Sequence, residues 1–483
     1  MQKPSKNGKN EVTYMFEMQT ENQNVPYQDF ELVPKIKHGI WQLFPSICAS
    51  LTCVPFGLML GWPSPTYPNL VGLDSPIPIT MGQSAMVAGF LMFGVSFGTI
   101  FSRKMFRIGP KFGIIFGNIC IVLGWVIMWQ ANAIYGLLAS RLLLGTGHGY
   151  AMGQIKIYIH EMTEDDLTGT LIKHLNFYGL FGFVMAYAMG PFVDFRQYAW
   201  VSLIVASGVL LIAIFLPATP RELIRASKMP DARKLIMFLK PESDVDSELC
   251  KIMEKMTVKL EDPGFTKLMR DRELRTNLIK LTFLLICQQY SGVPPTLVYT
   301  QIIYIQSKVP YPEFFSMGHA VLFLFCNILG TYVSSRFNRK VTLLVSSGGV
   351  IVLLMCEVAV IYYKVNEQYF SYASVIVLYL FICVHTLGLG SIPFMLIHDW
   401  FPPNYRGFVT NYFIILFNIL ALTITKTFQV LMTQFSLFMP FLLFLGVVVF
   451  AFIFILFFIP YSFQKTSFYQ TNIRECTDMR VKK

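Results

Sequence analysis

Two adjacent glutamines, Gln288 and Gln289, interrupt a long apolar segment of the chain. Gln288 lies about eight residues beyond Lys280, roughly 12 Å along a helix and so near the middle of a bilayer. Amides and hydroxyls both donate and accept hydrogen bonds, as the hydroxyls of an uncharged polyol require. The alternative is a set of hydrogen bonds that only hold a helix bundle together. Five further residues with polar groups or rings lie on the same two helix faces as this pair: Ser291, Pro295, Thr296, Tyr299 and Thr300.

A second pattern, an acidic residue after Ile-His at the end of a predicted helix, occurs twice in the chain. Ile159-His160-Glu161 is followed seven residues after the acid by Thr168-Gly169, and Ile397-His398-Asp399 is followed at the same spacing by Arg406-Gly407. Carboxylates at helix ends beside basic loops can form ion pairs that open and close. The repetition predicts two parallel copies of one structural unit, with a cavity between them.

The elements that carry these residues are apolar segments long enough to cross a bilayer. Each is roughly 17 to 25 residues, which as a helix spans the ~30 Å hydrocarbon core. The sequence therefore predicts an all-α membrane protein with twelve transmembrane helices in two six-helix bundles. The twelve segments lie near 42–61, 82–102, 112–130, 134–157, 169–190, 197–216, 278–305, 314–334, 341–362, 371–398, 407–430 and 437–459.

Composition and charge placement agree with a membrane protein. Hydrophobic residues make up 54% of the chain and charged residues only 14%. Most Lys and Arg residues fall in predicted cytoplasmic loops and tails, and only Arg196, Lys308 and Lys364 fall in outer loops. This asymmetry predicts that both termini are cytoplasmic in a multi-pass protein of the cell membrane. It also accounts for the net charge of +11 without a nucleic-acid partner.

The predicted spans divide the chain into five parts. A cytoplasmic tail (1–40) precedes the first six-helix bundle (41–216), and a charged linker (217–277) precedes the second bundle (278–459). A short cytoplasmic tail (460–483) follows. The linker mixes charged and apolar residues in a pattern typical of short amphipathic helices, which can brace the bundles or attach to the membrane surface.

Several motifs together resemble the sugar porter family of the major facilitator superfamily, over about residues 40–460. Two further stretches, Gly61-Trp62-Pro-Ser-Pro65 and Thr425-Lys426-Thr-Phe428, are similar to the insect facilitated trehalose transporter branch of that family. The family motifs are Gln288-Gln289-Tyr-Ser-Gly292, Ser140-Arg141 with Gly145, Gly147 and Gly149, Pro217-Ala-Thr-Pro-Arg221, and Phe401-Pro402 with Arg406-Gly407.

The resemblance implies a set of sugar-binding residues, with departures from the family pattern. Pro294 replaces an asparagine that contacts sugar in the family, Asn176 replaces a glutamine, and Phe394 replaces a tryptophan. Phe323 also replaces an asparagine, so the predicted pocket is more aromatic than the family pattern. The predicted substrate-binding residues are Gln288, Gln289, Asn176, Tyr299, Phe394 and Asn418.

The resemblance also implies a charge network that controls opening at the cytoplasmic side. The predicted members are Arg107, Lys111, Arg141, Glu161, Arg336, Arg339, Asp399 and Arg406. Helix breaks are expected at Pro294, Pro295 and Pro393, because proline lacks the N–H that a helix interior needs.

The predicted function is passive, alternating-access transport of a small neutral sugar, trehalose or a hexose. No carboxylate is predicted in the central cavity: the first span has Leu58-Met-Leu-Gly-Trp62 where proton-linked relatives carry an aspartate. We expect no enzymatic activity, cofactor or metal, because no His, Cys and Asp cluster has the required spacing. We expect a protein that works as a monomer in the lipid bilayer. The alternative is a transport-incompetent sugar sensor, or a carrier of a non-sugar small molecule, on the same fold.

Overall fold

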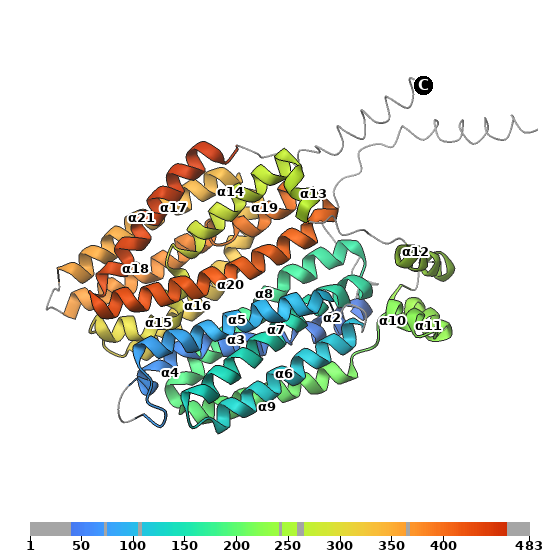
Figure 1. Ribbon diagram of the computed structural model, residues 1–483, viewed down its shortest axis with the longest axis horizontal. Helices are drawn as coiled ribbons and strands as arrows, with labels where there is room; N and C mark the ends of the chain where they lie inside the picture. Colours follow the sequence, from blue (N-terminus) through green and yellow to red (C-terminus); the bar gives the residue numbers. More distant parts are fainter. Residues whose placement is uncertain are drawn as a thin grey trace, which may run out of the picture.

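The structure is a computed structural model that describes residues 40–71, 75–104, 109–240, 244–257, 265–363 and 368–460 (Figure 1). Apart from Ile40 and Pro460, the predicted terminal tails lie outside the described residues. Arg107, a predicted member of the charge network, lies outside them as well.

The N-terminal half contains six spans, of which the first is built from three consecutive helices. These three are separated by a turn at Leu51 and Thr52 and by Trp62. Pro63 begins the third piece, at a position where a missing N–H costs nothing. The helices are α2 (Ile40–Ser50), α3 (Cys53–Gly61), α4 (Pro63–Leu70), α5 (Met81–Lys104), α6 (Pro110–Gln130), α7 (Ile134–Met162), α8 (Asp165–Met189) and α9 (Phe195–Phe215), with a 3₁₀ turn at Gly190–Phe192 after α8.

The C-terminal half repeats this plan, and four short helices connect the two halves. The connecting helices are α10 (Pro220–Arg225), α11 (Met229–Leu239), α12 (Val245–Thr257) and α13 (Phe265–Arg270). The helices of the second half are α14 (Arg272–Gln289), α15 (Val293–Gln306), α16 (Pro312–Arg336), α17 (Arg339–Tyr362), α18 (Gln368–Leu387), α19 (Ile392–Trp400), α20 (Pro403–Gln434) and α21 (Phe438–Phe458).

Nine helical segments of the described chain are long and apolar enough to span a membrane. The other three predicted spans are α7, α8 and the pair α14–α15. Their composition explains the difference: α7 carries Arg141 and Lys156, α8 begins with acidic and polar residues, and the α14–α15 pair is broken. Such spans are buried by neighbouring helices rather than by lipid.

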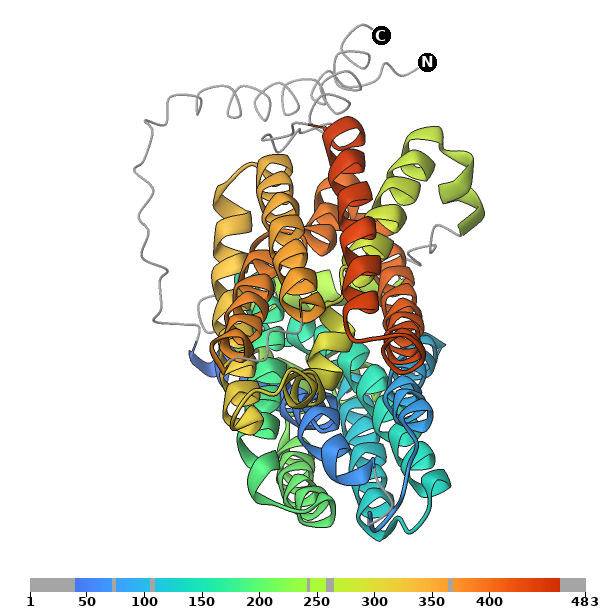
Figure 2. The same cartoon turned by 90° about the vertical axis from the view of Figure 1, so that its left-hand side faces the viewer.

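The same helix pairs pack together in both halves, which explains the sequence repeat. Spans two and four pack as α5 on α7 and as α16 on α18, and spans three and six pack as α6 on α9 and as α17 on α21. Spans one and five pack as α3 on α8 in the first half and as α14 on α20 in the second. Figure 2 shows the C-terminal half (orange to red) above the N-terminal half (blue to green).

Glycines allow α5 and α7 to approach backbone to backbone. A Cβ atom at Gly145 would lie 2.2 Å from the carbonyl oxygen of Leu91, and one at Gly149 would lie 2.1 Å from that of Val95. No real side chain fits at such distances. Close packing of this kind substitutes for the hydrophobic effect, which does not bring helices together in lipid.

Two ends of the bundle matter for the site. We call the end where α10, α11 and α12 lie the linker end, on the right of Figure 1, and the end where α4 and α15 meet the far end. The halves contact each other through α5 with α20, α8 with α16 and α4 with α15.

Candidate functional site

The glutamine pair closes the last turn of α14, directly before a break in the helix. Gly292 follows with φ of +102°, a left-handed conformation that favours glycine, and α15 then starts at Val293. Nε2 of Gln288 donates to the carbonyl oxygen of Gly390, 2.7 Å away, in the break between α18 and α19. Its Oε1 atom is buried and accepts no hydrogen bond from the described residues.

The second glutamine points toward α20. Nε2 of Gln289 donates to the carbonyl oxygen of Phe417 at 3.3 Å, and Nδ2 of Asn418 donates within its own helix to Ile414 at 2.8 Å. The ring of Phe394, from α19, lies 5.8 Å from that of Phe417. The structure therefore brings Gln288, Gln289, Phe394 and the Asn418 segment together where α14, α19 and α20 meet.

The predicted prolines lie next to these breaks. Pro294 and Pro295 occupy the first turn of α15, where helical N–H groups lack partners anyway. Pro393 is the second residue of α19, just after the break that contains Gly390. A further kink in α15 occurs at Tyr299, whose φ and ψ are −113° and 16°. The breaks leave backbone carbonyls near the glutamines available for hydrogen bonding.

Two other predicted sugar-binding residues lie elsewhere. Asn176 is exposed on α8 in the opposite half, and no described hydrogen bond joins it to the glutamine pair. Tyr299 is fully buried at the far end. Phe323 packs edge-on against Phe183 of α8, with ring centroids 5.9 Å apart, and so contributes to the contact between the halves.

Tyr299 is the centre of the contact that closes the far end. Its hydroxyl lies 3.0 Å from Oγ of Ser84 on α5, across the boundary between the halves. Its ring stacks 5.6 Å from Phe428 and lies 5.8 Å from Tyr67 on α4. Tyr67 in turn donates to the carbonyl oxygen of Ser84 at 2.7 Å.

Further hydrogen bonds join the halves around this tyrosine. The hydroxyl of Tyr187 donates to the carbonyl oxygen of Leu297, and the backbone N–H of Gln301 donates to Oγ of Ser64 at 3.3 Å. Nζ of Lys426 donates to the carbonyl oxygen of Gly82, also at 3.3 Å. Among the described residues, all side-chain hydrogen bonds between the halves lie at the far end. The described side-chain hydrogen bonds therefore hold the halves together at the far end.

Replacing Tyr299 by phenylalanine should loosen this closed end. The variant keeps the ring stack on Phe428 but loses the bond to Ser84, which is worth about 0.5–1.5 kcal/mol. We expect a cysteine placed at Ser64 to react faster with a water-soluble maleimide in Tyr299→Phe than in the parent protein. Tyr311→Phe, an exposed tyrosine on the loop before α16, is the matched control. Equal reactivity in all three proteins would contradict the assignment of Tyr299 to the closure.

The predicted charge network forms pairs within each half. Asp399 pairs with Arg339 at 2.5 Å, and Glu161 pairs with Arg221 at 3.5 Å and accepts from Thr219 at 2.7 Å. Neither pair crosses the boundary between the halves. In the sequence, Arg221 stands out only as the last residue of the Pro217–Arg221 motif, and nothing there indicates that it is the partner of Glu161.

The other predicted bases of the network have different contacts. The backbone N–H of Lys111 donates to Glu222 at 2.9 Å, and burial raises the pKa of that carboxyl despite this bond. Arg336 lies over the ring of Tyr332, and Arg406 donates from Nε to the carbonyl oxygen of Phe401.

Arg141 is buried inside the N-terminal half and stabilises the broken first span. It donates to the carbonyl oxygen of Met59, and its guanidinium lies 4.1 Å from the ring centroid of Trp62. No ion pair of Arg141 is found in the described part of the chain. The guanidinium thus donates to a carbonyl freed by the helix break and stacks on Trp62, while its Nε and Nη2 atoms have no described hydrogen-bond partner.

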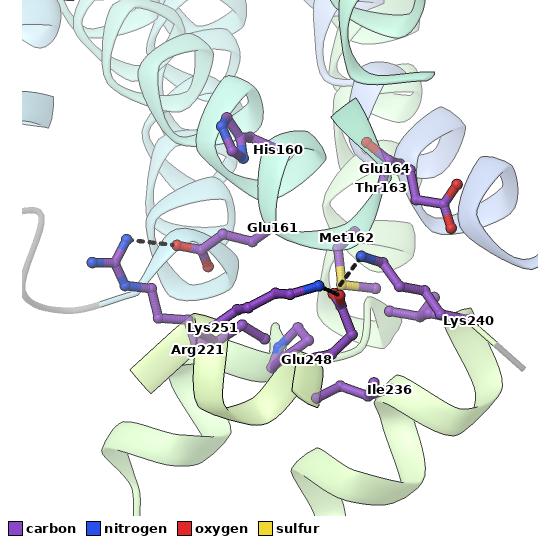
Figure 3. Close-up of a pocket in the computed structure, with 13 residues that line it drawn as sticks. His160, Glu161, Met162, Thr163, Glu164, Arg221, Ile236, Lys240, Glu248 and Lys251 are labelled. Atoms are coloured by element: carbon purple, nitrogen blue, oxygen red, sulfur yellow. Dashed lines mark hydrogen bonds and ion pairs between the residues drawn. The ribbon is translucent and has the colours of Figure 1, made fainter. Parts of the chain in front are cut away.

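A cavity of about 350 Å³ lies at the linker end, between the end of α7 and helices α10 to α12. Figure 3 shows the ammonium groups of Lys240 and Lys251 both pointing at Glu248, at 2.8 and 2.9 Å. These hydrogen bonds lower the pKa of the Glu248 carboxyl and raise that of Lys251. The cavity contains none of the predicted sugar-binding residues, so we assign it to the docking of the connecting helices.

The described residues contain no group of three or more His, Cys, Asp or Glu side chains that could hold a metal ion. The chemistry that the glutamine junction offers is hydrogen bonding by neutral amides beside aromatic rings. Such a set binds uncharged polar molecules.

Comparisons with known proteins place this geometry in context. A family model described as sugar (and other) transporter matches residues 14–472. The chain is 23% identical over 430 residues to the facilitated trehalose transporter Tret1 of Bombyx mori, covering 87% of this chain and 84% of that protein. It is 24% identical over 413 residues to the solute carrier family 2 facilitated glucose transporter member 8 of Mus musculus, covering 80% and 84%.

Solved structures show the same fold. The inward open conformation of the xylose transporter XylE from E. coli superposes with a TM-score of 0.72 at 15% identity, covering 88% of this chain and 98% of that one. A partially occluded inward open conformation of the same transporter gives 0.71 at 16% identity, with 88% and 99% covered. The predicted major facilitator fold of two six-helix bundles is confirmed.

Proposed function

This chain belongs to the sugar (and other) transporter family, and we propose that it carries a small neutral sugar across the membrane passively, by alternating access. Membership makes it a transporter rather than an enzyme. The similar protein from Bombyx mori is described as a trehalose transporter and that from Mus musculus as a glucose transporter. Trehalose or a hexose is therefore the proposed substrate.

The observation that carries the proposal is the buried Oε1 atom of Gln288, which accepts no hydrogen bond from the described residues. A buried amide oxygen without a partner costs about 1–3 kcal/mol, and a sugar hydroxyl that donates to it removes this cost. Gln289 and Asn418 supply further neutral groups, and Phe394 supplies an aromatic face for a sugar ring. Asn176 and Tyr299 join this set when the halves close around the sugar and α15 moves.

Passive transport is supported by the lack of a titratable acid at the junction among the described residues. Glu357, the acid inside span nine, is buried on α17 and accepts from Ser374 at 2.6 Å. No described hydrogen bond or ion pair joins it to α14, α19 or α20. A carboxylate that binds sugar and proton together is the usual requirement for coupled uptake.

We place the linker end in the cytosol and both termini with it, in the cell membrane. The support is the concentration of Lys and Arg at predicted cytoplasmic positions. In this orientation the far end, where the described hydrogen bonds join the halves, faces the outside. Glu161, Asp399 and the bases near them would then control the cytosolic opening. The proposed carrier acts as a monomer and binds no nucleic acid.

Uptake of radiolabelled trehalose and glucose into oocytes tests the proposal. We expect saturable uptake that stops at equal concentrations on both sides and is unchanged by a protonophore. Accumulation against the gradient that collapses with the protonophore would show coupled transport instead. No uptake of any sugar by protein present at the surface would favour a sugar sensor or a non-sugar carrier. The replacements at Pro294, Phe323 and Phe394 motivate this alternative.

A further inference from the structure

The two helix breaks beside the glutamine pair are joined by a second side chain as well as by Gln288. His385, in the last turn of α18, is buried, and its Nε2 atom lies 2.9 Å from Oγ of Ser291, in the break between α14 and α15. The backbone carbonyl of the same histidine accepts from the N–H of Gly390 at 2.8 Å, in the break between α18 and α19. His385 therefore contacts both breaks at once, although it lies outside the family motifs of the sequence.

These contacts complete a closed loop of hydrogen bonds. Oγ of Ser291 donates to the carbonyl oxygen of Gln288 at 2.6 Å, and Nε2 of Gln288 donates to the carbonyl oxygen of Gly390 at 2.7 Å. The two bonds of His385 close the loop. We call Gln288, Ser291, His385 and Gly390 the break ring. A movement of either break relative to the other must distort at least one bond of this ring.

The donors and acceptors of the break ring are fixed by chemistry. A carbonyl oxygen only accepts, so the single hydroxyl proton of Ser291 lies toward Gln288. The hydroxyl can then only accept from His385, and Nε2 of that imidazole must carry a proton. For the same reason the amide group of Gln288 that faces the Gly390 carbonyl is its NH₂. Oε1 of Gln288 is left as the buried atom to which no described residue donates.

We propose that His385 is a positioning residue that determines which sugars bind at the glutamine junction. By holding Ser291 against α18, it keeps the end of α14 beside Gly390 and fixes the Gln288 amide with its oxygen available. A sugar substituent at this position must then donate a hydrogen bond, because one that only accepts leaves the buried oxygen unpaired. The inference rests on the proposed function, since it assigns the selectivity of the same sugar site.

Glucose analogues in which fluorine replaces one hydroxyl at a time test this selectivity, because fluorine cannot donate. The measurement is competition with radiolabelled glucose for exchange by the full-length protein in proteoliposomes. In the parent protein we expect the replacement at one position to weaken competition roughly tenfold, from the loss of one hydrogen bond to a buried acceptor. In His385→Phe, which keeps a ring but has no donor, this preference should disappear, because the Gln288 amide can turn its NH₂ toward the fluorine.

Further variants separate positioning from general damage. His385→Gln carries a donating Nε2 group and should retain the parent's preference for a hydroxyl. Ser291→Ala should lose the preference as His385→Phe does, and the double variant should lose no more. Ser291→Ala is the smaller change and should fold even where His385→Phe does not. His319→Phe, which removes another buried histidine of the C-terminal half, is the matched control and should keep the preference.

Two results of this experiment would overturn the proposal. One is a parent protein that discriminates against fluorine at no position. The other is a set of variants at His385 and Ser291 that bind every analogue more weakly by the same factor, because a merely structural role would lower affinity without changing the preference.

Nitrogen NMR of the protein with isotope-labelled histidine tests the break ring without any sugar. A difference spectrum between the parent and His385→Phe isolates the His385 signals from those of the seven histidines in the chain. Protonated and unprotonated ring nitrogens have well separated shifts, so the tautomer can be determined directly. We expect a proton on Nε2 and a shift that changes in Ser291→Ala. An imidazole protonated only at Nδ1 would overturn the proposal.

The two measurements distinguish this inference from the proposed function. If Nε2 carries the proton but no sugar is exchanged, the proposed function fails, and the role of His385 in selectivity fails with it. If glucose is exchanged but no analogue reveals a preference for a donor, the proposed function stands and the inference alone is wrong.

Discussion

Gln288→Ala should lower the affinity for the transported sugar by roughly tenfold or more, the largest effect expected from any single contact in the site. The substitution removes the amide oxygen to which a sugar hydroxyl would donate. It also leaves the carbonyl of Gly390 without its donor. Loss of paired bonds to one amide in a buried site costs on the order of 1–3 kcal/mol, and 1.4 kcal/mol is a factor of ten. The measurement is the half-saturation concentration for exchange of radiolabelled sugar in proteoliposomes.

A matched glutamine elsewhere separates this effect from general damage. Gln434 is exposed at the last turn of α20, so Gln434→Ala should exchange sugar as the parent does. Gln288→Asn keeps the amide but shortens its reach and should fall between the two. Unchanged affinity in a folded Gln288→Ala protein would remove Gln288 from the sugar site, while leaving the fold and the family unaffected.

The fold followed from the sequence because its main determinants are local. The length of each apolar segment, the placement of Lys and Arg and the spacing of the Glu161 and Asp399 motifs are visible without any tertiary contact. The depth of Gln288 in its span followed from its distance to Lys280 in the same way. These features predicted two six-helix bundles and a polar junction between them, and the fold is confirmed.

The remaining features depend on how helices distant in sequence approach each other. Nothing near Glu161 in the sequence indicates Arg221 as its partner, because the two residues meet only when α10 docks on α7. Arg141 was expected in a charge network, but it lies beside Trp62 because the first span breaks there.

The sequence could not predict at which end the two halves are joined, and the reason is physical. The same residues must form both the open and the closed arrangement, so the sequence encodes two sets of contacts at similar free energy. Tyr299 illustrates this: its position on the same helix face as Gln288 predicted a role in the sugar site, and the structure shows it in the far-end contact with Ser84.

Gly292→Ala should be the most damaging small substitution in the C-terminal half. At φ of +102° an L-residue is strained, and a Cβ atom there would lie 2.2 Å from the ring of Phe444. Strain and overpacking together should lower the free energy of unfolding by about 2–5 kcal/mol. Because Gly292 joins the glutamine pair on α14 to the closing helix α15, sugar exchange should fall even in the fraction that folds.

Gly446→Ala provides the comparison for this prediction. A Cβ atom at Gly446, inside α21, meets nothing within 4 Å, and alanine favours a helix over glycine by about 1 kcal/mol. The apparent melting temperature in detergent should therefore fall in Gly292→Ala and stay level or rise in Gly446→Ala. Similar melting temperatures and similar sugar exchange in both variants would mean that the turn after Gln289 tolerates a side chain. In that case α14 and α15 would have to be joined by a different backbone conformation from the one described here.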